Sequence, residues 1–281
     1  MNWATRAPSA LDYFAALVAQ DDGLPLLEAV AAVALDEYPE LDVQTVLDGV
    51  DRLLERLRRR LPADAAPLHR LRLLNHFFFR ELSFGGNLND GYDPDNSYVH
   101  VVLRTRRGIP VSLAVLWLEL AQGIGLRAAG INFPGHFLVK VQLPHGQVII
   151  DPSSGRSLSR EELVERLEPY KRRLGLLDEF DIPVELFLQA ATPREIVARV
   201  LRNLKEIHRS QRDWLRLVAV LDRLIVLLPE AWDEVRERGL AWAELGQTAR
   251  ALADLEAYLA HADDPLHTAA VEQRVRALRG A

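Results

Sequence analysis

Three side chains in the middle of the chain are of the types that act together in nucleophilic catalysis. Ser112 stands two residues after Pro110, His136 follows a Pro-Gly pair, and Asp151 ends a short apolar run. A hydroxyl, an imidazole and a carboxylate can serve as nucleophile, general base and orienting group when a fold brings them together. We therefore treat Ser112, His136 and Asp151 as candidate catalytic residues that form a triad.

Each of the three also has a common structural role. A serine at a helix start often accepts hydrogen bonds from unpaired backbone N–H groups. A histidine at a strand start is more often exposed or hydrogen-bonded than catalytic, and an aspartate in Asp-Pro-Ser-Ser is typical of a turn. Taken one at a time, the residues favour these structural roles, and both interpretations remain open.

The element that carries Ser112 is predicted to be a buried helix. The segment VSLAVLWLELAQGIG, residues 111–125, is apolar on almost every side and ends in glycines. Pro110 suits the first turn of such a helix. Unpaired N–H groups and the helix dipole favour negative charge at this end, so an oxyanion there would be stabilised.

Short apolar segments separated by Pro and Gly are predicted to be strands, at residues 127–133, 136–143 and 147–151. Side-chain alternation places Phe137 and Val139 in a core and His136, at the start of its strand, on the opposite face. The middle of the chain is therefore predicted to be a central helix on a small antiparallel sheet.

The turn between the last two strands decides whether the candidate residues meet. A tight turn at residues 145–146 would place Asp151 opposite Lys140, about 13 Å along the strand from His136. A loop centred nearer residues 143–144, or a bulge, would bring Asp151 beside His136. Both registers keep the two side chains on one face of the sheet.

The parts on either side of this sheet are predicted to be mainly helical. Apolar residues recur at helical spacing from Ser9 to about Phe84, which predicts three or four amphipathic helices. They are followed by a long loop at residues 83–97, rich in Gly, Asn, Asp and Pro. We expect three regions: an N-terminal helical region at 1–90, the core at 91–185 and helical repeats at 190–281.

A faint period of 34 residues marks the C-terminal helices. Gly239 and Gly246 fall where a tetratricopeptide (TPR) unit carries small residues. The preceding unit is degenerate, because Lys205 and Arg212 occupy the matching positions. With so few good repeats, we expect the array to depend on the middle domain for stability.

The order and setting of the three candidate residues are similar to those of a known family. The run ELSFGGN…YDPDNSYVHVVLRTRRGIPVSLAVLWLELAQGIGL…GINFPGHFLVKV…IIDPSSG closely resembles the SirB family, in its transglutaminase-like branch, over about Leu71 to Leu158. The resemblance implies an α+β fold with a papain-like core and C-terminal TPR-like helices. It places Ser112 at the position of the catalytic cysteine, His136 at the histidine and Asp151 at the aspartate.

Residue 112 is a serine where the family pattern has a cysteine, and this difference decides which function we expect. The chain has no cysteine, which excludes thiol catalysis by its own residues. A thiol has a pKa of about 8.5, whereas a serine hydroxyl is a far weaker acid. The predicted function is therefore a degenerate, pseudoenzyme-like protein that binds a peptide or protein partner or has a regulatory role. The alternative is a serine-dependent amide hydrolase or acyltransferase that uses Ser112, His136 and Asp151.

Composition narrows the other possibilities. The net charge of -6 gives no general attraction to nucleic acid or an anionic membrane, although Arg104, Arg106 and Arg107 form a local basic run. No segment approaches the roughly 18 apolar residues of a membrane span, so a cytoplasmic bacterial protein is expected. Metal-binding and phosphate-binding motifs are absent from the sequence, and we predict no metal and no other cofactor.

Overall fold

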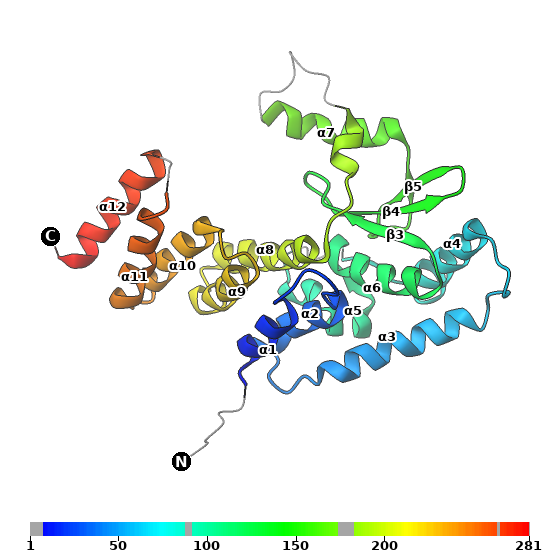
Figure 1. Ribbon diagram of the computed structural model, residues 1–281, viewed down its shortest axis with the longest axis horizontal. Coiled ribbons are helices and arrows are strands. Elements are labelled where there is room, and N and C mark those ends of the chain that lie inside the picture. Colours follow the sequence, from blue (N-terminus) through cyan, green and yellow to red (C-terminus); the bar gives the residue numbers. More distant parts are fainter. Residues whose placement is uncertain (1–7, 88–91, 174–182, 263–264, 281) are drawn as a thin grey trace. The chain divides into compact units, whose positions relative to one another are not determined.

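The computed structural model describes residues 8–87, 92–173, 183–262 and 265–280 (Figure 1). The chain divides into two compact units, one comprising Asp21–Val200 and the other comprising Met1–Gln20 with Leu201–Ala281. The prediction of a mixed helical and sheet fold is confirmed. The sequence analysis divided the chain into three regions, at 1–90, 91–185 and 190–281. That division stays a prediction, because the two compact units have other boundaries.

Helices dominate the unit Asp21–Val200. Its α-helices are α2 (Leu26–Ala32), α3 (Val43–Arg58), α4 (Pro67–Asn75), α5 (Val99–Thr105), α6 (Pro110–Gly123), α7 (Arg160–Arg173) and the start of α8 (Pro193–Gln211). Shorter turns are the 3-10 helices η1 (Val33–Asp36), η3 (Pro94–Ser97) and η4 (Val184–Leu188) and the π-helix η2 (His76–Glu81). The expected amphipathic pattern is clear in α3, where Val46, Val50, Leu53 and Leu57 form the buried stripe.

The same unit contains two small sheets. The larger is antiparallel, in the order β3 (Arg127–Ile131), β4 (Leu138–Leu143), β5 (Gly146–Ile150) and β6 (Ser157–Leu158). The smaller pairs β1 (Gly85–Gly86) with β2 (Arg107–Gly108) in parallel, and β1 lies within the stretch that was expected to be loop. The three longer strands confirm the predicted sheet.

The structure corrects two details of the predicted sheet. Leu143 pairs with Gly146, so the turn consists of Pro144 and His145 and lies between the two positions, 145–146 and 143–144, that the sequence left open. Proline has no N–H for the ladder, which suits Pro144 to the turn. The strand β4 begins at Leu138, so His136 lies in the turn before the strand and not at its start.

The sheet is covered on both faces, as Figure 1 shows, with α6 against one side and α7 with η4 against the other. The predicted central helix is confirmed, and Trp117 in its middle is fully buried. On the other face, Leu138 packs with Leu163 and Leu167 of α7. Core side chains therefore lie on both faces of the sheet, next to the strand ends where His136 precedes β4 and Asp151 follows β5.

The second unit is a stack of helices. It contains α1 (Ala10–Leu17), the end of α8, α9 (Trp214–Leu227), α10 (Trp232–Glu244), α11 (Thr248–Leu259) and α12 (Pro265–Arg279). A Cβ atom at Gly239 would lie 2.9 Å from side-chain carbons of Leu255, so glycine allows α10 and α11 to approach closely. Gly246, with φ of +70°, forms the tight turn between these two helices.

Candidate functional site

Ser112 is the third residue of α6 and is fully buried. Its hydroxyl donates a hydrogen bond to the backbone oxygen of Asn96 at 2.6 Å. The hydroxyl oxygen of Ser112 also accepts a hydrogen bond from the backbone N–H of Ile109 at 3.2 Å. The hydroxyl therefore satisfies the start of α6 and ties it to η3, which is the structural role that its sequence position also allowed.

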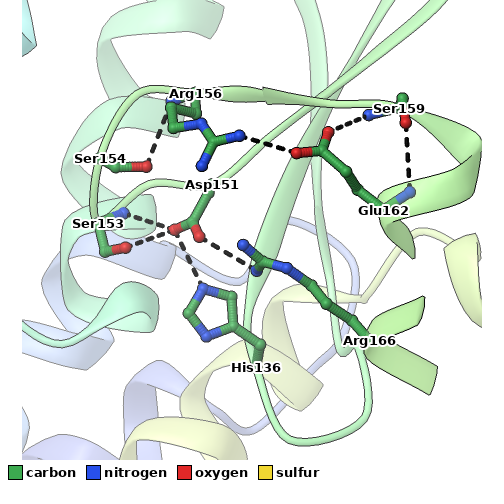
Figure 2. A network of polar contacts seen from close by, with 8 residues as sticks. All are labelled: His136, Asp151, Ser153, Ser154, Arg156, Ser159, Glu162 and Arg166. Carbon is green, nitrogen blue, oxygen red and sulfur yellow. Dashed lines mark hydrogen bonds and ion pairs between the residues drawn. The ribbon is translucent and has the colours of Figure 1, made fainter. Parts of the chain in front are cut away.

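His136 and Asp151 meet in the structure. The Nε2 atom of His136 lies 3.0 Å from Oδ1 of Asp151 (Figure 2). This is an ion-pair distance, although the ring is not aligned with the carboxylate for a regular hydrogen bond. The observed turn leaves Asp151 just beyond the pair Val139–Ile150, and the turn before β4 brings the imidazole back to it.

Asp151 is the centre of a wider polar network. Figure 2 shows His136, Ser153 and Arg166 reaching its carboxylate from different sides. Oδ1 accepts hydrogen bonds from the backbone N–H of Ser153 at 3.0 Å and from its hydroxyl at 2.5 Å, and Oδ2 accepts one from Nη1 of Arg166 at 3.2 Å. Asp151 thus acts in both ways that the sequence left open, because it contacts the imidazole and also caps the following turn.

The network keeps Asp151 ionised. Burial by itself raises the pKa of this carboxyl, but the interactions with His136 and Ser153 outweigh it and hold the pKa well below its usual range. Only 7% of the Asp151 side chain is exposed, compared with 26% for His136. The pair therefore presents a partly open imidazole that is backed by a buried negative charge.

A path of backbone contacts connects this network to the start of α6. The N–H of Gly86 donates to the backbone oxygen of Ser153 at 2.9 Å, and Gly86 pairs with Gly108 in the small parallel sheet. A Cβ atom at Gly108 would lie 2.7 Å from Oγ of Ser112, so only glycine fits there. Among the described residues, however, the hydroxyl of Ser112 bonds with Asn96 and Ile109 and not with His136.

Three contributors to this site were not identified from the sequence. Arg166 lies on α7, fifteen residues after Asp151, and its sequence context resembles any solvated helix face. Asn96 contributes a backbone oxygen, which no residue type reveals. Ser153 was recognised as part of a turn but not as a donor to Asp151. Within the described ranges, no group of three or more His, Asp or Glu side chains could hold a metal ion.

The sequence model described as the transglutaminase-like superfamily matches residues 44–202, more than half of the chain, and this range contains Ser112, His136, Asp151, Ser153 and Arg166. The chain belongs to the transglutaminase-like superfamily. In this superfamily member, a tetratricopeptide-repeat model also matches residues 204–276, which confirms the predicted repeats. The predicted family is confirmed as well.

Relatives of this transglutaminase-like protein match over nearly its whole length. A UPF0162 protein of Xylella fastidiosa is 37% identical over 85% of this chain and 84% of its own, which places the chain in that family. A UPF0162 protein of Pseudomonas aeruginosa is 29% identical over 89% of both chains. F-box only protein 21 of Mus musculus is 40% identical over 67 residues, 24% of this chain and 11% of its own. No solved structure matches the chain.

None of the helices within the described ranges has the length and apolar character that a membrane span requires.

Proposed function

We propose that the protein is a non-catalytic, transglutaminase-like binding protein that recognises a protein or peptide partner through its repeat helices. The observation that carries this proposal is the state of the Ser112 hydroxyl. It is fully buried, and the acceptors within its reach are the backbone oxygens of Asn96 and Ile109. A nucleophile must reach both a substrate carbonyl and a base, and this hydroxyl is oriented toward neither.

The energetics point the same way. To attack a substrate, the Ser112 hydroxyl would first have to break its hydrogen bonds with Asn96 and Ile109. It would then have to transfer its proton to His136 during the attack. A serine hydroxyl forms no standing alkoxide at a helix N-terminus, unlike a thiol. The chain has no cysteine to take over this role.

The repeat unit offers a surface for a partner. A groove of about 770 Å³ is lined by residues from the end of α8 and from α9, α10 and α12. Its apolar part includes Trp214 and Leu240, and Leu240 is 37% exposed. Arg212 and Arg236 stand among the lining residues. Glu237 and Glu244 line the groove as well, so its apolar floor and charges of both signs suit a peptide with apolar and polar side chains.

The proposal is tested by photo-crosslinking the full chain to its partners in cells, with the crosslinker placed beside the groove and the captured proteins identified by mass spectrometry. The variant Leu240→Asp should lose the specific partners, because it places a charge on the apolar floor. Leu68→Asp is the matched control, since Leu68 is similarly exposed, at 44%, and lies outside the groove. If the wild type, Leu240→Asp and Leu68→Asp all capture the same partners, the proposal is contradicted.

A second candidate is a serine-dependent amide hydrolase or acyltransferase. The observation that favours it is the 3.0 Å contact between His136 and Asp151, which resembles the base and orienting group of a triad. It requires a rearrangement that turns Ser112 toward His136. A fluorophosphonate probe tests it: an adduct on Ser112 that disappears in His136→Ala supports the candidate, and the absence of any adduct on Ser112 rejects it.

A further inference from the structure

A second pocket, of about 570 Å³, lies between α3 and the end of α5 in the unit Asp21–Val200. Its cationic residues are Arg52 and Arg56, one helical turn apart on α3, and Arg104 and Arg106 at the end of α5. His100 completes the group, and no aspartate or glutamate lines the pocket. The predicted basic run therefore contributes two of its three arginines to a concave site.

The acidic neighbours of these arginines are engaged elsewhere. On α3, Asp48 accepts a hydrogen bond from the side chain of Gln44, and Glu55 pairs with Arg59. Within the described ranges, none of the four pocket arginines forms an ion pair, whereas arginines at other sites do, such as Arg238 with Asp222 and Asp254. Four cations thus face one pocket without a protein anion.

Polar atoms in this pocket are buried without a partner. Nη1 of Arg106 and Nδ1 of His100 are both shielded from solvent and make no hydrogen bond. Buried donors of this kind are rare in proteins unless a ligand or water satisfies them. The guanidinium of Arg106 therefore has donor capacity that the protein itself does not use.

The backbone holds Arg106 in an unusual conformation. It ends α5 with φ of +64°, a left-handed geometry in which glycine or asparagine is more common. Its guanidinium lies 4.6 Å from the centre of the Phe84 ring, which fixes its direction. Burial, together with the nearby Arg56, lowers the pKa of Arg106, so the cations repel one another where no anion is bound.

We propose that this pocket binds a small molecule that carries at least two phosphate groups. Guanidinium groups match the oxygens of phosphate in paired hydrogen bonds, and four of them suit a ligand with several negative charges. The apolar side chains of Leu53 and Leu103 line the same pocket and would contact the organic part of the ligand. A small ligand fits better than a nucleic acid, because the net charge of -6 repels a long polyanion that extends beyond this pocket.

The test is titration calorimetry of the full chain with inorganic pyrophosphate, at low salt and with sodium chloride at matched ionic strength as the blank. We expect saturable binding that weakens about tenfold or more in Arg56→Gln/Arg104→Gln, because the double variant loses two charged hydrogen-bond donors. Both side chains are exposed, so the double variant should fold normally. Arg59→Gln removes one positive charge at the C-terminal cap of α3, outside the pocket, and should bind as the wild type does.

The results that overturn the proposal are equally specific. Absence of saturable pyrophosphate binding, or equal weakening by Arg59→Gln, removes the pocket as a phosphate site. Duplex DNA offered in a parallel titration separates the ligand classes: binding of DNA with loss in the same double variant, and no effect of pyrophosphate, would assign the site to a polymer. Lysine substitution of Arg56 and Arg104 should restore part of the affinity, because it keeps the charge but not the paired hydrogen bonds.

Discussion

Ser112 and Asn96 are joined by a hydrogen bond from a buried hydroxyl to a backbone oxygen at 2.6 Å, sixteen residues apart in the sequence. The bond fixes the start of α6 against η3 and directs the hydroxyl hydrogen into the protein. His136, by contrast, has its ring beside Asp151. The residues that resemble a triad are thus divided between a structural cap and a histidine–aspartate pair.

The structural role of Ser112 predicts a small, defined loss of stability. Ser112→Ala removes the hydrogen bonds of the hydroxyl with Asn96 and Ile109, but the N–H of Ile109 and the oxygen of Asn96 keep their bond with each other. We expect the free energy of unfolding to fall by about 1 kcal/mol in urea denaturation. Ser154→Ala, at an exposed position in the Asp151 turn, is the control and should change it by less than about 0.5 kcal/mol.

The Asp151 network predicts a larger effect. Asp151→Asn removes the buried charge that His136, Ser153 and Arg166 contact, so we expect a loss of about 2 kcal/mol in the free energy of unfolding. Arg166→Gln should cost less, about 1 kcal/mol or below, because 37% of the arginine side chain is exposed to solvent. Equal effects of the two variants would show that the carboxylate is not the centre of the network.

The lowered pKa of Asp151 predicts how stability depends on pH. The folded protein keeps this carboxyl ionised to lower pH than the unfolded chain does, so the unfolded state binds more protons and stability rises with pH in that range. The stabilisation should be complete above about pH 4, the unperturbed value, and be lost as pH falls below it. Urea titrations at several pH values should show the difference between the wild type and Asp151→Asn shrinking in acid; a difference that grows there contradicts the assignment.

Packing in the repeat unit can be tested at a helical glycine. Gly239→Ala places a Cβ atom 2.9 Å from the Leu255 side chain, so we expect a net destabilisation of about 1–2 kcal/mol despite the better helix propensity of alanine. Gly49→Ala, in α3, meets its nearest atoms at 3.8 Å. This control should be neutral or stabilised by up to about 1 kcal/mol. Thermal unfolding followed by circular dichroism measures both.

The elements with strong periodicity could be predicted from the sequence, and the junctions could not. The apolar segment of residues 111–125 gave the central helix because a helix buried on all sides needs that composition. The turn between β4 and β5 was left open between residues 145–146 and 143–144, because Gly146 and Pro144 both favour turns, and the structure has it at residues 144–145.

The candidate site shows the same limit. The contact of His136 with Asp151 was implied by the family resemblance, whereas strand register alone left it open. The hydrogen bond of Ser112 is made to a backbone oxygen, which has no signature in residue type. Arg166 reaches Asp151 from a helix of ordinary charged composition. Contacts through the backbone or through one long side chain become visible only once the chain has folded.

The most direct test of the proposed function uses the absence of cysteine. Ser112→Cys introduces a single thiol at the position in question, and its alkylation by iodoacetamide reports whether this position is open to a small substrate. We predict that the native variant reacts at least about 100-fold more slowly than Ser154→Cys, because residue 112 is fully buried. Alkylation faster than that of the exposed control, with a thiol pKa below about 8.5, would contradict the account and indicate an accessible, activated nucleophile position.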